Sequence, residues 1–229
     1  MPSASPPSQA DSQAPAWLQH GAGRQMLADV QRMATPELTR IFGQHGLYLR
    51  PSASLSGELS GNMLANVISL HRVRDAFGGQ LQCLDAELPI SSGSLSLVYS
   101  LFILESSADP EALMQEIARS LKPEGVALIA SLNPWSPARL RWLPRIGFGL
   151  ATSSIERMAR EAGLDLIRKQ FLGPYWPTTS SSISDLGGNR WRDGFRAASL
   201  LVLRRREAGL TPLRKASPAV SLRPGMSAG

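Results

Sequence analysis

Cysteine is almost absent from this chain of 229 residues, and its absence excludes several kinds of site. The single cysteine, Cys83, cannot form an internal disulfide and cannot supply a cysteine-rich zinc centre. The three histidines, His20, His45 and His71, stand far apart in the sequence. With one cysteine and no closely spaced pair of histidines, the sequence predicts no metal site.

Long apolar runs are missing as well. No stretch approaches the roughly 20 apolar residues that a helix needs to cross a bilayer. The first residues have neither a basic start nor an apolar run, so they do not resemble a secretory signal. Together with the scarcity of cysteine, these absences predict a cytoplasmic protein. The apolar share of 43% is typical of globular proteins and is sufficient for a full core.

Large apolar residues are scarce at both ends of the chain. Residues 1–16 are mainly Pro, Ser, Ala and Gln, and a similar composition returns after residue 206. Such segments bury too little apolar surface to offset the entropy of ordering. We therefore expect a disordered N-terminal segment at 1–16, one folded domain at 17–206 and a disordered basic tail at 207–229.

Acidic residues are outnumbered by basic ones, and the formal net charge is +6. Residues 139–145 mix basic and aromatic groups, which suits an anionic substrate, a lipid surface or RNA as well as a solvated loop. No run reaches the roughly five or six like charges that are typical of a nucleic-acid-binding arm. The sequence therefore favours a solvated basic surface. Nucleic acid is not the expected partner, while peripheral contact with a membrane stays open.

What the sequence does contain is an alternation of helical and strand-like patterns. Apolar residues at helical spacing predict a helix over 25–42, which Pro36 is expected to break. A second helix should begin at Pro110, since Asp109 is a favourable N-cap and proline fits the first helical position. A third helix is predicted at 153–162.

Short apolar runs predict the strands. We expect them at residues 46–49, 67–70, 81–84, 97–104, 126–132, 164–171 and 197–203. The run at 97–104 is apolar almost throughout, which is typical of a strand buried on both faces of a parallel sheet. Strands that alternate with helices indicate an α/β fold.

Residues 84–134 carry four short patterns in a fixed order. They are Asp85-Ala86, Leu88-Pro89-Ile90, Ser94-Leu95-Ser96-Leu97-Val98 and Leu121-Lys122-Pro123-Glu124-Gly125. With these patterns the chain resembles class I S-adenosylmethionine-dependent methyltransferases, in particular the ubiquinone-biosynthesis-like branch, over roughly residues 25–204. The resemblance implies a Rossmann-like fold, with a mostly parallel sheet, an antiparallel last strand and helices on both faces.

The resemblance also implies residues that contact the cofactor, S-adenosylmethionine. In the family, the positions of Asp85 and Ala86 lie against the adenine ring, where the acid accepts from the exocyclic amine; without the surrounding pattern, Asp85 would be interpreted as a turn residue. Ser100 and Phe102 match the end of the fourth strand, which faces the methyl donor. Doubly wound sheets hold ligands beyond their strand ends, but core packing is the alternative for both residues.

The first half of the chain departs from the family. There the first strand ends in an acid and a glycine-rich loop of the form D-x-G-x-G-x-G, which lets the backbone approach the ligand. Here Tyr48 holds the acidic position, and Arg50, Ser52 and Ser54 hold the glycine positions. We expect cofactor binding to be weakened or lost, unless Arg50 swings aside to grip the cofactor carboxylate. In that case Arg50 and Ser52 are cofactor contacts.

Two further comparisons with the family concern the ends of strands. The second strand should end in an acid that holds the ribose, but Leu70-His71-Arg72 offers no carboxylate. Asn133-Pro134-Trp135 resembles the N-P-P-[YF] element of amino-directed methyltransferases, although that element follows the fourth strand and this one follows the fifth. Asn133 and Trp135 are therefore candidate substrate-binding residues, with packing as the alternative.

Two functions remain open at this point. The first is methyl transfer from S-adenosylmethionine to an unidentified small-molecule or lipid-like acceptor, in which catalysis is mostly alignment of the reactants and no catalytic residue stands out. The second is a catalytically inactive methyltransferase fold that acts as a binding or regulatory module for a ligand or a partner protein. The enzyme requires a pocket beside Asp85 and Ser100. The inactive protein requires that Arg50, or the segment 51–59, fills it.

Overall fold

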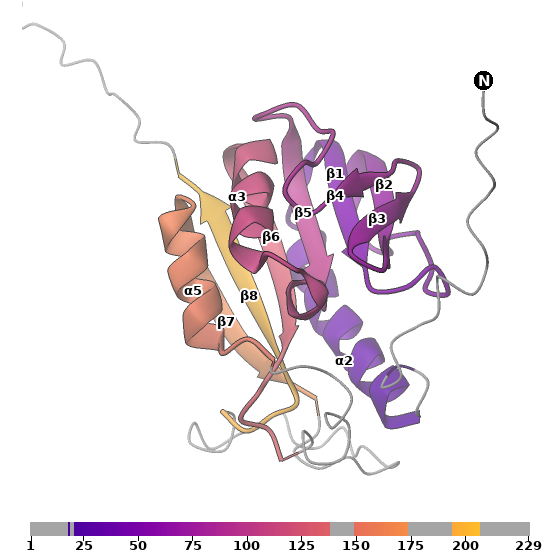
Figure 1. Cartoon of the computed structure of the whole chain (residues 1–229), viewed down its shortest axis with the longest axis vertical. Helices are drawn as coiled ribbons and strands as arrows, with labels where there is room; N and C mark the ends of the chain where they lie inside the picture. The colour runs from indigo at the N-terminus through magenta and orange to yellow at the C-terminus, as the bar shows by residue number, and fades with distance from the viewer. Residues whose placement is uncertain (1–17, 19–20, 138–148, 174–193, 207–229) are drawn as a thin grey trace, which may run out of the picture.

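The computed structural model describes residues 18, 21–137, 149–173 and 194–206 (Figure 1). The predictions made for residues 1–16, 139–145 and 207–229 lie outside these ranges. Within them, no helix combines the length and apolar character that crossing a membrane would need.

The described residues form one mixed sheet with three α-helices against it. The helices are α2 (Gly21–Leu38), α3 (Pro110–Ser120) and α5 (Thr152–Glu161), and a short 3-10 turn, η2, covers Leu104–Ser106. The strands are β1 (Phe42–Arg50), β2 (Met63–Val73), β3 (Ala76–Gly79), β4 (Cys83–Leu84), β5 (Leu95–Leu101), β6 (Leu121–Leu132), β7 (Leu164–Leu172) and β8 (Ala198–Arg205).

The strand order is β4-β3-β2-β1-β5-β6-β8-β7. The four central strands, β2, β1, β5 and β6, pair in parallel, while β3 is antiparallel to β2 and β8 is antiparallel to β6. Strand β4 is antiparallel to β3, and β7 is antiparallel to β8, so β4 and β7 run in the same direction as the four central strands. The predicted α/β fold, with a mostly parallel sheet and an antiparallel last strand, is confirmed.

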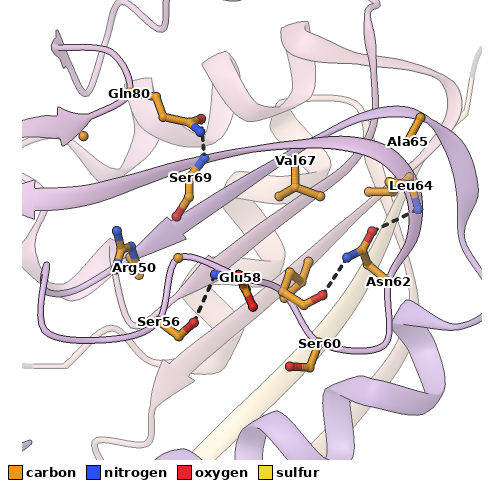
Figure 2. Close-up of a pocket in the computed structure, with 13 residues that line it drawn as sticks. Arg50, Ser56, Glu58, Ser60, Asn62, Leu64, Ala65, Val67, Ser69 and Gln80 are labelled. Carbon is orange, nitrogen blue, oxygen red and sulfur yellow. Dashed lines mark hydrogen bonds between the residues drawn. The ribbon is translucent and has the colours of Figure 1, made fainter.

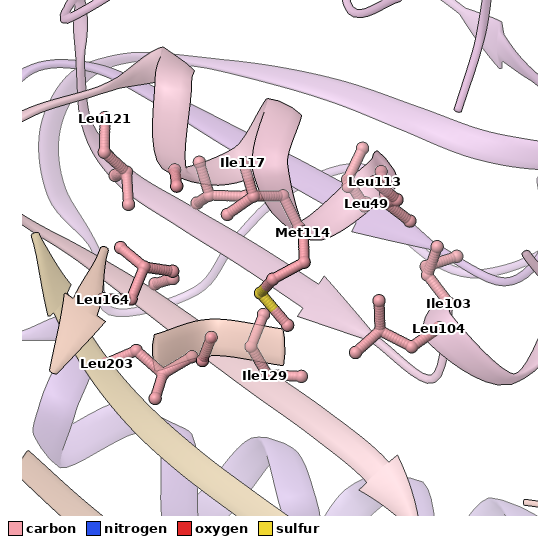
Figure 3. Packing of buried hydrophobic residues seen from close by; sticks show 14 of the residues in the cluster. Leu49, Ile103, Leu104, Leu113, Met114, Ile117, Leu121, Ile129, Leu164 and Leu203 are labelled. Atoms are coloured by element: carbon pink, nitrogen blue, oxygen red, sulfur yellow. The ribbon is translucent and has the colours of Figure 1, made fainter. Parts of the chain in front are cut away.

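Helices cover both faces of this sheet (Figure 1). Helix α2 packs on one face with a cluster that includes Tyr48 and Tyr99, and α3 and α5 pack on the other. On the second face Met114 points from α3 toward Ile129 of β6 (Figure 3). Strand β5 lies between the two clusters and is buried along its whole length, as its apolar sequence predicts.

Helix ends illustrate what local sequence specifies. The side chain of Asp109 accepts a hydrogen bond of 2.9 Å from the backbone N–H of Ala112, and Pro110 is the first residue of α3, as predicted. The expected break at Pro36 is wrong, because Pro36 lies within α2. The helix ends at Leu38, so that the proline interrupts only its last turn.

The connections around β2 are unusually short. Parallel strands are normally joined by a crossover with a helix, yet none of the described residues of the β1–β2 segment (residues 51–62) is helical. After β2 the chain turns at Arg74, which has a φ of 53°, and returns immediately as β3. The sequence did not predict β3. The face of β2 that lies on the α2 side is therefore covered by a loop instead of helices.

Candidate functional site

The carboxyl ends of β1, β2, β5 and β6 meet at one edge of the sheet, where α/β folds place their ligands. Strand β4 runs in the same direction and delivers Asp85 to this edge. The predicted site residues follow these strand ends: Arg50 and Ser52 after β1, Asp85 and Ala86 after β4, Ser100 and Phe102 at the end of β5, and Asn133 and Trp135 after β6. The topology thus brings the strand ends together, and the side chains decide what can bind there.

Asp85 lies in a buried ion pair with Arg72. The two side chains are only 7% exposed, and the guanidinium binds the carboxylate through both of its terminal nitrogens, one of them at 3.1 Å. The hydroxyl of Ser107 donates to the same carboxylate at 2.6 Å. Asp85 therefore accepts three hydrogen bonds from the protein itself, while its neighbour Ala86 is exposed.

Arg72 is held from three sides. Its Nε donates to the hydroxyl of Ser106 at 3.2 Å, and its guanidinium carbon lies 4.4 Å above the centre of the Phe77 ring. The planar group thus combines a bidentate salt bridge with a cation–π contact, the two geometries for which arginine is suited. Releasing Asp85 would leave this buried guanidinium without its anion.

Arg50 turns back into the loop that follows it. Its Nη1 donates to the carbonyl oxygens of Ala53, at 3.2 Å, and Leu55. Ser52 is fully buried, and its hydroxyl lies 2.9 Å from that of Ser54 and accepts from the Ser54 N–H at 3.2 Å. The residues at the family's glycine positions therefore form hydrogen bonds within this loop.

The end of β1 carries an aromatic stack in place of an acid. The rings of Tyr48 and Tyr99 lie 5.3 Å apart with an angle of 10° between their planes, and both are buried. Burial raises the pKa of both phenols, so each hydroxyl stays neutral. This part of the site cannot supply the negative charge that a carboxylate would offer a cationic or hydroxyl-bearing ligand.

Three groups near the ends of β5 and β6 have unusual environments. Ser100 is fully buried, and its hydroxyl has no hydrogen-bond partner among the described residues. Phe102 is buried with a φ of 53°, a conformation that costs an aromatic residue free energy and that often marks functional sites. Burial raises the pKa of Glu105, in η2, to about 7, although one of its oxygens accepts from the backbone N–H of Leu132.

Asn133 joins the end of β6 to the start of β8. Its amide nitrogen donates to the carbonyl oxygens of Gly194, at 2.7 Å, and Arg196, at 2.8 Å, while its side-chain oxygen accepts from the N–H of Trp135 at 3.1 Å. These bonds give Asn133 a structural task. The Trp135 side chain is 72% exposed within the described part of the chain.

A cavity of about 840 Å³ lies between β2 and the β1–β2 segment (Figure 2). Its described lining includes Arg50 and Ser69, but not Asp85, Ser100 or the other predicted site residues. It also includes Leu59, Leu64 and Val67, which pack with the cluster on the α2 face of the sheet. The cavity thus occupies the side of β2 where a crossover helix is missing.

Comparison with known proteins gives this arrangement a family. A family model described as a methyltransferase domain matches residues 40–129, which run from the start of β1 into β6. Over these residues the chain is similar to class I S-adenosylmethionine-dependent methyltransferases. Its methyltransferase domain implies S-adenosylmethionine as cofactor, and the acceptor is not determined.

The relatives are distant. The chain is 29% identical over 153 residues to malonyl-[acyl-carrier protein] O-methyltransferase of Marinomonas, covering 66% of this chain and 53% of that protein. It is 27% identical over 115 residues to ubiquinone biosynthesis O-methyltransferase of Parvibaculum lavamentivorans, covering 44% and 46%. The chain thus spans about half the length, or less, of the curated relatives that it matches.

A solved structure confirms the fold. A putative methyltransferase from Haloferax volcanii, solved in complex with the methyltransferase activator Trm112, superposes with a TM-score of 0.51 at 17% identity. The match covers 86% of this chain and all of that one. At this identity the similarity concerns the fold alone.

The residues of this methyltransferase domain do not fit S-adenosylmethionine in the arrangement that the family implies. The acid at the adenine position, Asp85, is already paired with Arg72. The loop after β1 is bonded to Arg50, and the stacked ring of Tyr48 stands in place of its acid.

Sequence reasoning missed two residues that define this site. It noted that Leu70-His71-Arg72 lacks a carboxylate, but not that an arginine in that position is a partner for Asp85. The sequence signal for this pairing was that the end of β2 lacks the family's acidic residue and carries a basic residue instead. Glu105 was missed because nothing in its sequence neighbourhood reveals that the 3-10 turn buries it.

Proposed function

We propose that this methyltransferase domain is a catalytically inactive binding or regulatory module, which does not hold S-adenosylmethionine in the family's usual manner. The observation that carries the proposal is the buried pair of Asp85 and Arg72. An adenine amine would have to replace Arg72 as the partner of the carboxylate, and it would bring no positive charge in exchange.

The energetic obstacle can be estimated. Removing one partner from a buried, hydrogen-bonded ion pair costs about 3–5 kcal/mol, because the other charge stays buried and unpaired. Each 1.4 kcal/mol corresponds to about tenfold in a dissociation constant, so this cost would weaken cofactor binding by about two to four powers of ten. Opening the loop bonds of Arg50 would add to it.

Thermal unfolding of the full chain with and without S-adenosylhomocysteine tests this proposal. A ligand present at about 100 times its dissociation constant stabilises a protein by about 2.7 kcal/mol, which would raise the melting temperature by about 5–10 °C for a domain of this size. We expect no rise at millimolar ligand. A rise of that size that is lost in Asp85→Asn would refute the proposal.

A second candidate function is methyl transfer to a small-molecule or lipid-like acceptor, and one observation favours it. Phe102 keeps a left-handed backbone conformation at the carboxyl end of β5, where the family holds its methyl donor, and such strain is often retained for function. In this alternative Arg50, Ser52, Asp85, Ala86, Ser100 and Phe102 contact the cofactor, and Asn133 and Trp135 contact the acceptor.

This alternative requires Arg72 and Arg50 to move when the cofactor binds. Arg72→Met should then improve binding of S-adenosylmethionine, because it frees Asp85 without removing it. Equilibrium dialysis with radiolabelled cofactor compares the wild type with this variant, and Arg157→Met, which changes an exposed arginine, is the matched control. Binding by Arg72→Met alone would mean that the fold retains a cofactor site which Arg72 closes.

A further inference from the structure

The cavity beside β2 contains polar groups that nothing in the described protein satisfies. Ser69 is only 7% exposed and lines the cavity, yet its hydroxyl has no hydrogen-bond partner among the described residues. The same holds for the buried Nε of Arg50. Buried polar groups are nearly always paired in folded proteins, so unpaired ones that line a cavity point to a ligand.

These two groups flank the same small space. A Cβ atom built on Gly57 would lie 3.3 Å from Nη2 of Arg50 and 3.3 Å from the hydroxyl oxygen of Ser69. Because position 57 is a glycine, that space stays open. Figure 2 shows Ser69 and Arg50 at the same end of the cavity.

The loop that follows Arg50 fixes the orientation of its guanidinium group. Its Nη1 is occupied by the carbonyl oxygens of Ala53 and Leu55, which fixes the guanidinium plane. The opposite edge, formed by Nε and Nη2, is the fork that binds a carboxylate through two parallel hydrogen bonds. A guanidinium that is fixed before binding loses less entropy on binding than a free one.

The charges around the cavity favour an anion with a single charge. Arg50 is the cation among the described lining residues, and Glu58 on the facing loop is an acid. His71 pairs with Arg50 across the two strands, and burial and the nearby charge of Arg50 lower its pKa, so the imidazole adds no second positive charge near neutral pH. One cation and one acid suit a carboxylate better than a phosphate dianion.

The remainder of the cavity is suited to an apolar body. Leu59, Leu64 and Val67 line it, and its volume of about 840 Å³ lies within the range of small-molecule sites, about 300–1,000 Å³. An inorganic anion would leave most of this space empty.

We propose that the cavity between β2 and the β1–β2 segment binds a small monocarboxylate with a short apolar body, whose carboxylate is held by the Nε–Nη2 edge of Arg50 and by the hydroxyl of Ser69. The inference rests on the proposed function and deepens it, because it names the ligand class of the module. The ligand lies on the α2 face of β2, away from the lining of the family's adenine position.

The test uses the full chain labelled with ¹⁵N and a matched set of probes. Hexanoate carries the expected head group and body, hexanamide keeps the body without the charge, and inorganic phosphate supplies an anion without the body. Titration is followed at the backbone amides of Gly57, Ser69 and Gln80, which line the cavity. We expect saturable shifts with hexanoate, and at least about tenfold weaker binding of the other two probes.

Three variants examine the geometry. Ser69→Ala should weaken hexanoate binding several-fold without destabilising the free protein, because its hydroxyl has no partner to lose. Gly57→Ala fills the space between the donors and should abolish binding. Arg50→Lys replaces the fork with a point charge and should weaken binding about tenfold, whereas Arg160→Lys, on the exposed face of α5, should have no effect.

The outcomes separate this inference from the proposed function. Absence of saturable shifts with hexanoate, or equal binding by Ser69→Ala and the wild type, would overturn the carboxylate site alone. Shifts at Ala86 and Ser100 on addition of S-adenosylhomocysteine would overturn the proposed function and leave the hexanoate result to be judged by itself. Preferential binding of phosphate over hexanoate would contradict the ligand class.

Discussion

Replacing Arg72 by methionine would remove one partner of the buried ion pair between Arg72 and Asp85. Methionine is unbranched, flexible and apolar, so it can follow the path of the arginine stem and pack against the Phe77 ring, which the guanidinium now covers. The carboxylate of Asp85 would stay buried and would keep the hydrogen bond from the hydroxyl of Ser107. The variant therefore removes the charge partner and leaves the buried acid in place.

The expected loss of folding stability is large for a single substitution. Breaking a buried ion pair by removing one partner costs about 3–5 kcal/mol, whereas replacing both partners by apolar residues is often neutral. In a domain of this size each kcal/mol changes the melting temperature by about 2–4 °C. Arg72→Met should therefore melt about 6–20 °C below the wild type, and Arg72→Met/Asp85→Leu should recover most of that difference.

Urea and thermal unfolding, followed by far-UV circular dichroism, measure both variants. Arg157→Met is the control, since Arg157 pairs with Glu111 and Glu161 at the surface with more than half of each side chain exposed, where ion pairs contribute about 1 kcal/mol or less. If Arg72→Met lowered the stability no more than this control, the buried Asp85 carboxylate would not need Arg72 as its partner. The argument that Arg72 keeps Asp85 from the cofactor would then fail.

Two further predictions concern pH and helix capping. The folded protein holds the Glu105 proton more tightly than the unfolded chain, since burial raises its pKa from 4.5 to about 7, so stability should fall by about 3 kcal/mol as the pH rises through this window. Urea titrations at pH 5 and pH 8 should show that Glu105→Gln removes this decline while keeping the acceptor for Leu132; an unchanged decline would contradict the burial of Glu105. Asp109→Ala should destabilise the protein by about 1 kcal/mol, because the N–H of Ala112 loses its cap, and Asp109→Asn should retain most of the stability. Equal urea midpoints for the wild type, Asp109→Ala and Asp109→Asn would contradict a stabilising role for this N-cap.

Local rules explain which parts of the fold could be predicted. The N-cap at Asp109, the proline at the first position of α3 and the buried apolar strand β5 each depend on a few neighbouring residues. The family patterns between residues 84 and 134 then supplied the topology, which no local rule contains. The N-terminal half was less predictable, because Pro36 is tolerated in the last turn of α2.

The hairpin at β3 was missed for a different reason. Strand β3 has four residues, Ala76–Gly79, two of them glycines, so it shows little of the alternation that predicts a strand. Its pairing is specified by the turn at Arg74 and by contact with β2, where a Cβ on Gly79 would lie 2.9 Å from the carbonyl oxygen of Ser69. Such contacts depend on the tertiary structure, so the local sequence does not predict them.

The candidate site shows the same limit. Sequence identified the positions that the family uses, including Asp85 and Arg50, and the structure gathers the strand ends that carry them. Whether these side chains point to a ligand or to one another depends on packing around β2 and β3. The pairing of Arg72 with Asp85 joins residues that lie on different strands, and only the fold brings them together.

Loss of the crossover helix after β1 connects the two proposals. The segment 51–62 is long enough to span from β1 to β2, yet it leaves a cavity on the α2 face of β2. Arg50, which stands at the first of the family's glycine positions, also lines this cavity, and its buried Nε has no hydrogen-bond partner among the described residues. The same loop therefore bears on both proposals, since it carries the residues at the family's glycine positions and also lines the cavity.

Calorimetric titration of the full chain with S-adenosylmethionine and S-adenosylhomocysteine tests the central claim most directly. The account predicts no binding heat at millimolar ligand, because Asp85 is held by Arg72 and Ser107 and the loop after β1 is held by Arg50. Micromolar binding with one ligand per chain, abolished by Asp85→Asn, would contradict it and would show that the cofactor displaces Arg72.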